Sequence, residues 1–111
     1  MMGRFNKFTC DANSTIADVY THIKKKRTTF AIIIKRKSVI GTFTLGDYKE
    51  SLFKGTNLNN KITTIAKKKF FKLEQGYDKS LLKKSFRKNT IDFIPILKKS
   101  KLVDIVFKKQ I

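Results

Sequence analysis

The sequence predicts a small α/β (α+β) protein made of two similar halves, in which a helix is followed by a β-hairpin. Two amphipathic helical segments occur, and each precedes two short apolar segments that are typical of strands. Corresponding segments lie about half a chain apart in 111 residues. Half-domains of this size need partners for their apolar faces. We therefore expect two small sheets with flanking helices, packed as a pseudo-two-fold pair.

The first half begins with a helix predicted over residues 14–26, with Asn13 or Ser14 as its N-cap. Its apolar positions follow helical spacing at Ile16, Val19, Tyr20 and Ile23. The segments 29–34 and 39–43 are apolar and rich in β-branched residues, and a polar turn separates them. They predict a β-hairpin.

A short helix is predicted over residues 47–53, with Gly55 just beyond its C-terminal end. A linker over 56–69 then leads to the second half. The elements predicted there are a strand over 70–73, a helix over 78–88, and strands over 91–97 and 102–107. The inner face of the second helix is expected to hold Leu81, Leu82, Ser85 and Phe86.

The two halves form an internal repeat. Ala31 is expected to correspond to Pro95, an offset of 64 residues, and Gly41 to Asp104, an offset of 63 residues. The second half ends before a counterpart of the helix over 47–53.

The composition bounds the function. Cys10 is the one cysteine, so no intramolecular disulfide forms, and we expect a small buried residue in an N-terminal strand. No apolar stretch approaches the roughly 20 residues of a membrane span. No secretory signal precedes the fold, so a cytoplasmic location without a membrane partner is expected.

The chain carries 26 Lys and Arg against 8 Asp and Glu, a formal net charge of +18. The basic runs lie at the ends of apolar segments, where chains usually turn at the surface. Two interpretations stay open: a solvated background charge, or a functional surface for anions. No sequence pattern of a nucleic-acid-binding family is present, so nucleic acid is not the expected partner.

No catalytic constellation is evident. His22 is the one histidine, and it is expected on an exposed helical face without a neighbouring nucleophile. Asp18 and Glu50 are isolated carboxylates that form no acid-base pair. The aromatic residues expected in the core are Phe30, Phe43, Phe86 and Phe93. The sequence therefore predicts a protein that is not an enzyme.

One motif carries a family resemblance. Gly41-Thr42-Phe43-Thr44-Leu45-Gly46-Asp47 follows the first hairpin and opens the short helix, and residues 91–97 form an apolar strand around Pro95. This arrangement resembles a pair of CBS (cystathionine-β-synthase) domain motifs. The resemblance makes residues 1–111 a CBS pair, with a first motif over about 5–55, a linker over 56–69 and a second motif over 70–111. Residues 41–55 are also similar to CBS pairs that precede sugar-phosphate nucleotidyltransferase domains.

The resemblance implies a regulatory ligand-sensing module that needs no cofactor. It would bind AMP, ADP, ATP or a related anion in the cleft between the motifs, and control an attached or partner nucleotidyltransferase. By the family pattern, Asp47 would bind the ribose hydroxyls, Thr44 the phosphate, and the amides of Gly46 and Asp47 would add positive dipole. The base would lie against strand edges at Thr9, Cys10, Thr29, Phe30 and Ala31.

Alternatives remain at three points. Thr44 and Asp47 also have the spacing of a helix capping pair. The second motif has Phe107 and Gln110 where Thr and Asp are expected, so a second equivalent site is in doubt. The module could instead be a basic interaction or dimerisation module that binds nucleic acid or another polyanion. A homodimer is expected in either case, through apolar helix faces formed by Tyr48, Leu52, Phe53, Leu81, Leu82 and Phe86.

Overall fold

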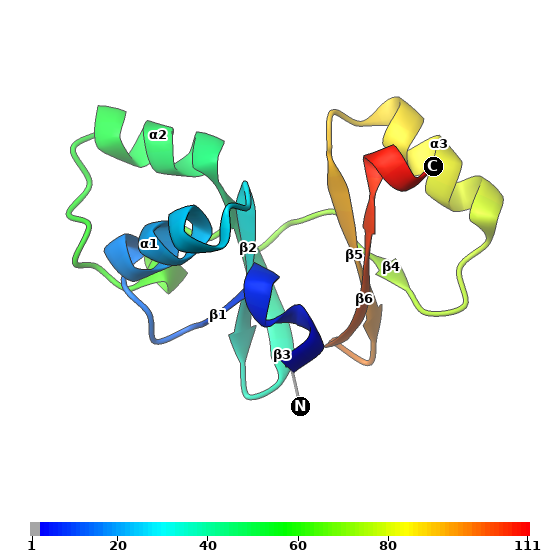
Figure 1. The fold of residues 1–111 in the computed structure, drawn as a ribbon, viewed down its shortest axis with the longest axis horizontal. Helices are drawn as coiled ribbons and strands as arrows, with labels where there is room; N and C mark the ends of the chain where they lie inside the picture. The colour runs from blue at the N-terminus through cyan, green and yellow to red at the C-terminus, as the bar shows by residue number, and fades with distance from the viewer. Residues whose placement is uncertain (1–2) are drawn as a thin grey trace. The chain divides into compact units, whose positions relative to one another are not determined.

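The computed structural model describes residues 3–111, which form two compact units divided after Phe70 (Figure 1). The first unit contains η1 (Gly3–Phe8), β1 (Thr9–Asp11), α1 (Ile16–Lys26), β2 (Phe30–Lys35), β3 (Ser38–Thr44), α2 (Leu45–Phe53) and η2 (Ile62–Thr64). In its sheet β2 is central, with β1 parallel on one edge and β3 antiparallel on the other. Helices and strands alternate as the sequence predicts.

The start of α1 differs from the prediction, because its N-cap is Thr15 and not Asn13 or Ser14. The Thr15 hydroxyl accepts a hydrogen bond from the Asp18 N–H at 3.0 Å, and the Asp18 carboxylate accepts one from the Thr15 N–H at 3.0 Å. This reciprocal capping box needs an acidic or amide side chain three residues after the cap. Only Thr15 has one at that spacing.

The hairpin between β2 and β3 turns through Arg36 and Lys37, whose φ angles are 50° and 70°. Positive φ at both central residues is the mark of a type I′ turn, which matches the right-handed twist of the strands. Glycine and asparagine usually occupy these positions. The second hairpin turns in the same way through Lys99 and Ser100.

The core of the first unit lies between α1 and one face of the sheet. Its fully buried members include Ile16, Val19, Ile23, Ala31, Ile33 and Phe43. Ile62 and Ala66, from the segment predicted as a linker, belong to the same cluster. Tyr20 is half-buried and stacks on Tyr48 of α2, with ring centroids 3.8 Å apart and planes inclined by 7°.

The second unit contains β4 (Leu73–Glu74), α3 (Lys79–Lys88), β5 (Phe93–Lys98), β6 (Lys101–Phe107) and η3 (Lys108–Gln110). The strand predicted over 70–73 is confined to β4, because only Leu73 and Glu74 pair with β5. Leu82, Ser85 and Phe86 are buried as predicted, but Leu81 is 46% exposed. Leu81 lies about 100° around the helix from Leu82, at the edge of the inner face.

The two hairpins have the same register. Phe30 pairs with Thr44 and Ile33 with Gly41 in the first, and the residues 63 positions later pair identically in the second. The predicted match of Gly41 with Asp104 is confirmed. The predicted match of Ala31 with Pro95 is wrong, because the constant offset pairs Ala31 with Ile94. Both hairpins have their irregularity at the same place, so the repeat contains no inserted residue.

Candidate functional site

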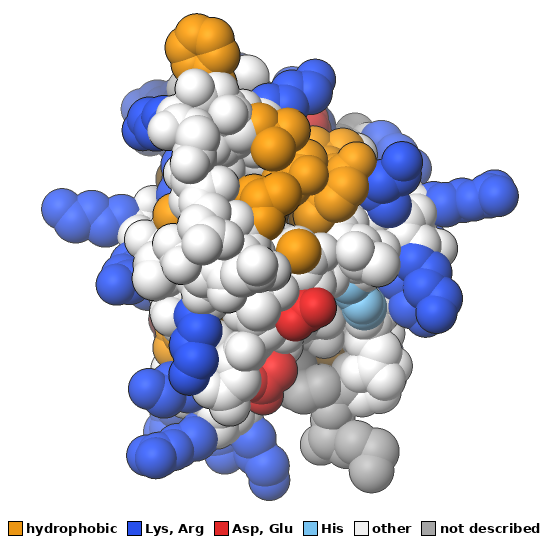
Figure 2. All heavy atoms as spheres, turned by 90° about the vertical axis from the view of Figure 1, so that its left-hand side faces the viewer, with side chains coloured by type: hydrophobic (Ala, Val, Ile, Leu, Met, Phe, Trp, Pro, Cys, Tyr) orange, Lys and Arg blue, Asp and Glu red, His pale blue; other side chains and the backbone are white. Residues whose placement is uncertain are grey.

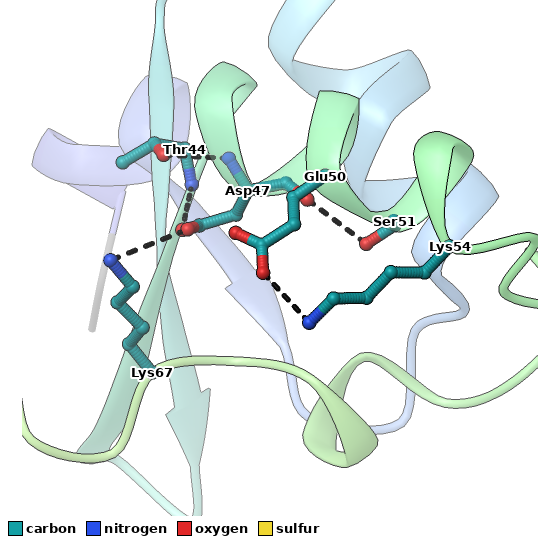
Figure 3. A network of polar contacts seen from close by, with 6 residues as sticks. All are labelled: Thr44, Asp47, Glu50, Ser51, Lys54 and Lys67. Atoms are coloured by element: carbon teal, nitrogen blue, oxygen red, sulfur yellow. Dashed lines mark hydrogen bonds and ion pairs between the residues drawn. The ribbon is translucent and has the colours of Figure 1, made fainter.

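The conserved-looking motif opens α2 through a second capping box (Figure 3). The Thr44 hydroxyl accepts a hydrogen bond from the Asp47 N–H at 3.1 Å, and the Asp47 carboxylate accepts one from the Thr44 N–H at 2.9 Å. Thr44 is the last residue of β3, so the box fixes the angle at which the chain passes from strand to helix. The capping role considered for this pair is therefore present in the structure.

The Asp47 carboxylate is also engaged from outside its helix. Its Oδ1 atom lies 3.5 Å from the Nζ atom of Lys67. The side chain of Asp47 is 12% exposed, whereas that of Lys67 is 66% exposed. The two oxygens of the carboxylate thus face different partners, the backbone of β3 and the ammonium group of Lys67.

The backbone of Lys67 is held against β3. Its N–H donates to the carbonyl oxygen of Thr42 at 2.9 Å, and its carbonyl oxygen accepts from the Thr42 N–H at 3.0 Å. This close approach requires Gly41, because a Cβ atom there would lie 2.9 Å from the Lys67 carbonyl oxygen. The glycine of the motif thus brings the segment after η2 up to the sheet.

A pocket of about 250 Å³ lies beside this cluster. It is lined by Asp47, Glu50, Ser51, Lys54, Thr56, Ile65 and Lys67. Glu50 and Lys54 form an ion pair at 2.8 Å within α2, and the Ser51 hydroxyl donates to the Asp47 carbonyl oxygen at 3.0 Å. The pocket combines anionic and cationic side chains with hydroxyl groups at its wall, a setting for a small polar ligand.

Of the residues predicted to hold the base, those of β2 lie closest to the motif. Phe30 is directly opposite Thr44 in the β2–β3 ladder, and the carbonyl oxygen of Thr29 accepts from the Leu45 N–H at 3.0 Å. Thr9 and Cys10 belong to β1, on the other edge of β2. The structure therefore places Thr29 and Phe30 beside the Thr44 motif and separates Thr9 and Cys10 from it by a strand.

The side chains at these positions differ in access. Ala31 is fully buried in the core, so only its backbone could contact a ligand. Phe30 is buried and stacks on Phe8 with ring centroids 5.2 Å apart. Cys10 is half-buried, and this burial raises the pKa of its thiol to about 11, with a smaller contribution from the charge of Asp18. The Cys10 thiol is therefore protonated at neutral pH.

Several residues of the cluster were not predicted. Lys67 appears in the sequence only as one member of a basic run, and Ser51, Lys54, Thr56 and Ile65 carry no motif. The contact of Lys67 with Asp47 depends on the tertiary pairing of residues 42 and 67. A small residue at position 41 and the apolar pair Ile65-Ala66 next to Lys67 are the available signals, and neither specifies that pairing.

The remaining candidate groups do not assemble a reactive centre. Among residues 3–111, no three His, Cys, Asp or Glu side chains come together in a way that could hold a metal ion. His22 is half-buried and not exposed as predicted, with its Nε2 atom 3.0 Å from the Asn6 carbonyl oxygen. Phe30, Phe43 and Phe86 are buried as predicted, and Phe93 is half-buried. None of the helices described has the length and apolar character needed to cross a membrane.

Comparison with known proteins gives a match at the level of the fold. No family model matches the chain, and no curated protein matches it. Among solved structures, it is similar to the CBS domain protein PAE2072 from Pyrobaculum aerophilum complexed with AMP, at 17% identity and a TM-score of 0.79, over 92% of this chain and 80% of that one.

Two further CBS proteins are similar. The CBS domains of a transcriptional regulator from Streptococcus pneumoniae match at 14% identity and a TM-score of 0.76, over 92% of this chain and 82% of that one. The CBS-domain protein ATU1752 from Agrobacterium tumefaciens matches at 15% identity and a TM-score of 0.75, over 94% of this chain and 89% of that one. The chain therefore has the fold of a CBS-domain pair.

Proposed function

We propose that this chain is a non-catalytic regulatory module that binds an adenine nucleotide, or a related anion, at the start of α2. The observation that carries the proposal is the Thr44–Asp47 box, which presents a hydroxyl, a carboxylate and helix-opening amides beside a cationic side chain. A ribose needs an acceptor for its hydroxyls, and a phosphate needs donors and positive dipole. A solved protein of the same fold is complexed with AMP, which supports this choice of ligand.

The capping contacts leave capacity for a ligand. A carboxylate has about four acceptor positions, and the box uses one of them for the Thr44 N–H. The Thr44 hydroxyl accepts from the Asp47 N–H, so its own hydrogen is available for donation. Asp47 would accept from the ribose hydroxyls, Thr44 would donate to the phosphate, and the amide of Gly46 would add to the positive end of the helix. Capping and nucleotide binding are thus compatible roles for one pair of residues.

The other residues of the proposed site are assigned to the base. Thr29 and Phe30 would offer backbone and apolar contacts, with Ala31 contributing through its backbone. Thr9 and Cys10 of β1 would extend this surface across β2. Alanine at Thr29 should weaken binding of AMP but leave binding of ribose 5-phosphate unchanged, whereas equal loss for both ligands would contradict a role in base recognition.

A matched pair of variants tests the site. Asp18 and Asp47 occupy the same position in two capping boxes, but only Asp47 lines the pocket. A hydrogen bond to a charged group is worth roughly 1.5–3 kcal/mol. Asp47→Ala should therefore weaken AMP binding by about 10- to 100-fold in calorimetry, whereas Asp18→Ala should not change it. Equal affinities in the two variants would show that Asp47 only caps its helix.

We also propose that the module is a homodimer formed through α2. Figure 2 shows hydrophobic side chains gathered on the side of the first unit that carries α1 and α2. Phe53 is 94% exposed and Leu52 is 51% exposed, which is unusual for large apolar residues. Leu82 and Phe86 cannot contribute as expected, because they are buried in the core of the second unit. Light scattering should give twice the mass of 12.9 kDa, and Phe53→Lys should shift it to the monomer value.

The regulated partner is proposed to be a sugar-phosphate nucleotidyltransferase domain, on the resemblance of residues 41–55. Its presence next to this module in the natural reading frame, or its co-purification with the chain, would support the assignment. Stimulation or inhibition of its pyrophosphate release by AMP, only in the presence of this chain, would establish the regulation. A partner whose activity ignores the chain would contradict it.

A second candidate function is binding of a polyanion such as nucleic acid. Exposed cations gather at the hairpin turns, at Lys35, Arg36, Lys37, Lys98, Lys99 and Lys101. Binding through such a surface releases counterions, so its affinity would fall steeply with added salt and would ignore Asp47. Titration of AMP and of a DNA duplex at two salt concentrations separates the two functions. AMP binding should survive the higher salt, and the duplex should not bind there.

A further inference from the structure

Lys67 is held in place by groups that have no other evident use for its side chain. Its backbone is fixed to Thr42 by two hydrogen bonds, two residues before Thr44. Its ammonium group reaches back over the start of α2 and lies 3.5 Å from Asp47 (Figure 3). A charge-assisted hydrogen bond between nitrogen and a carboxylate oxygen is usually 2.7–2.9 Å long. The ion pair is therefore loose, although the backbone on each side of it is fixed.

The location is unfavourable for a cation alone. The N-terminal end of a helix carries about half a positive charge, which attracts anions and repels an ammonium group. Asp47 offsets this repulsion only in part, because its other oxygen is bound to the Thr44 N–H. A phosphate at this point would interact favourably with both the helix end and the ammonium group. The exposed side chain of Lys67 has a flexible stem that can turn from Asp47 toward such a group.

We infer that Lys67 is the residue that selects phosphorylated ligands at this site. The inference rests on the proposed nucleotide site and adds to it a residue outside the family motif. When the ligand binds, the Lys67 ammonium donates to the phosphate and releases Asp47 Oδ1 for the ribose hydroxyls. Lys67 thus favours nucleotides over nucleosides, because in the absence of a phosphate it continues to occupy Asp47.

Lys54 provides a matched control. It lines the same pocket, carries the same charge and is 67% exposed, against 66% for Lys67. It differs in its partner, because Lys54 is held by Glu50 of the same helix at 2.8 Å. Removal of either charge changes the net charge of the protein equally. A difference between Lys67→Met and Lys54→Met therefore reports position and not overall electrostatics.

The test measures the affinities of adenosine, AMP and inorganic pyrophosphate for the full chain and three variants. Wild type should bind AMP more tightly than adenosine, and Lys67→Met should lose about tenfold in AMP affinity while adenosine binding is unchanged or stronger. Lys54→Met should behave as wild type, and Lys67→Arg should recover most of the AMP affinity. Unaltered thermal unfolding of each variant confirms that it folds.

The outcomes separate this inference from the proposed function. Equal AMP affinity in wild type and Lys67→Met, or equal binding of adenosine and AMP by wild type, would overturn the inference but retain the nucleotide site. Absence of binding by adenosine and AMP would overturn the proposed function. The pyrophosphate titration then decides the inference by itself, since binding that depends on Lys67 but not on Lys54 would uphold it, and no such binding would overturn it.

Discussion

The side-chain oxygen of Gln110 accepts a hydrogen bond from the backbone N–H of Phe107 at 2.7 Å. This contact repeats, 63 residues later, the one that Asp47 makes with the Thr44 N–H. The second motif therefore keeps the backbone cap of the first. It lacks the hydroxyl of Thr44 and the negative charge of Asp47, the two groups assigned above to the ligand.

The first prediction is a stoichiometry of one nucleotide per chain. The reason is this asymmetry, since Phe107 cannot donate to a phosphate and the Gln110 amide carries no charge to compensate two ribose hydroxyls. Calorimetry with AMP should fit a single site on wild type. Two sites of equal affinity, both retained in Asp47→Ala, would contradict the assignment.

The second prediction concerns Gly41. An alanine Cβ would lie 2.9 Å from the Lys67 carbonyl oxygen and 3.3 Å from the Ala66 Cβ, so strand and linker must separate. Gly41→Ala should lower the free energy of unfolding by about 1–3 kcal/mol. Gly46→Ala is the control, because its Cβ would meet only the Thr44 hydroxyl at an ordinary 3.6 Å. Urea unfolding of both variants is the measurement, and an equal effect would refute the close approach.

The third prediction compares the two N-caps. Thr15→Ala and Thr44→Ala each remove one side-chain cap, so each should lower the free energy of unfolding by about 1 kcal/mol. Only Thr44→Ala should also weaken AMP binding. If both variants lose AMP affinity in proportion to their stability, the effect is one of folding, and Thr44 has no role at the ligand.

The elements of this fold could be predicted from the sequence because local patterns determine them. Helical spacing identifies α1 and α3, β-branched runs identify the hairpins, and Gly55, with a φ of 71°, ends α2 as expected. Errors occur where spacing is ambiguous. Leu81 is apolar at an edge of its helix, and Asn13, Ser14 and Thr15 are all cap-forming residues, of which only Thr15 has a carboxylate at the required distance.

The candidate site was predictable only in part. Thr44 and Asp47 belong to one short motif, so their mutual contact follows from spacing. Lys67 reaches Asp47 through the pairing of Thr42 with Lys67, a contact between positions 25 residues apart. No periodicity encodes such a contact. The basic run of Lys67, Lys68 and Lys69 is consistent equally with a solvated surface.

The fourth prediction is a pH effect at Cys10. Burial raises the pKa of this thiol from 9.0 to about 11, so the folded protein holds the proton more tightly than the unfolded chain. The resulting stabilisation is complete below pH 9 and is lost as pH rises toward 11. Relative to Cys10→Ala, wild type should lose about 1 kcal/mol of unfolding free energy across this range, allowing for partial exposure. A difference independent of pH would contradict this environment.

The most direct test of the central claim is an amide NMR titration of the full chain with AMP. The start of α2 is predicted to respond, with the largest shift changes at Thr44, Gly46 and Asp47, saturating together. The Thr15–Asp18 box serves as an internal reference, because it has the same local structure and lies outside the pocket. Its amides should stay unchanged. Equal shifts at both boxes, or shifts confined to the basic hairpin turns, would contradict a nucleotide site at Asp47.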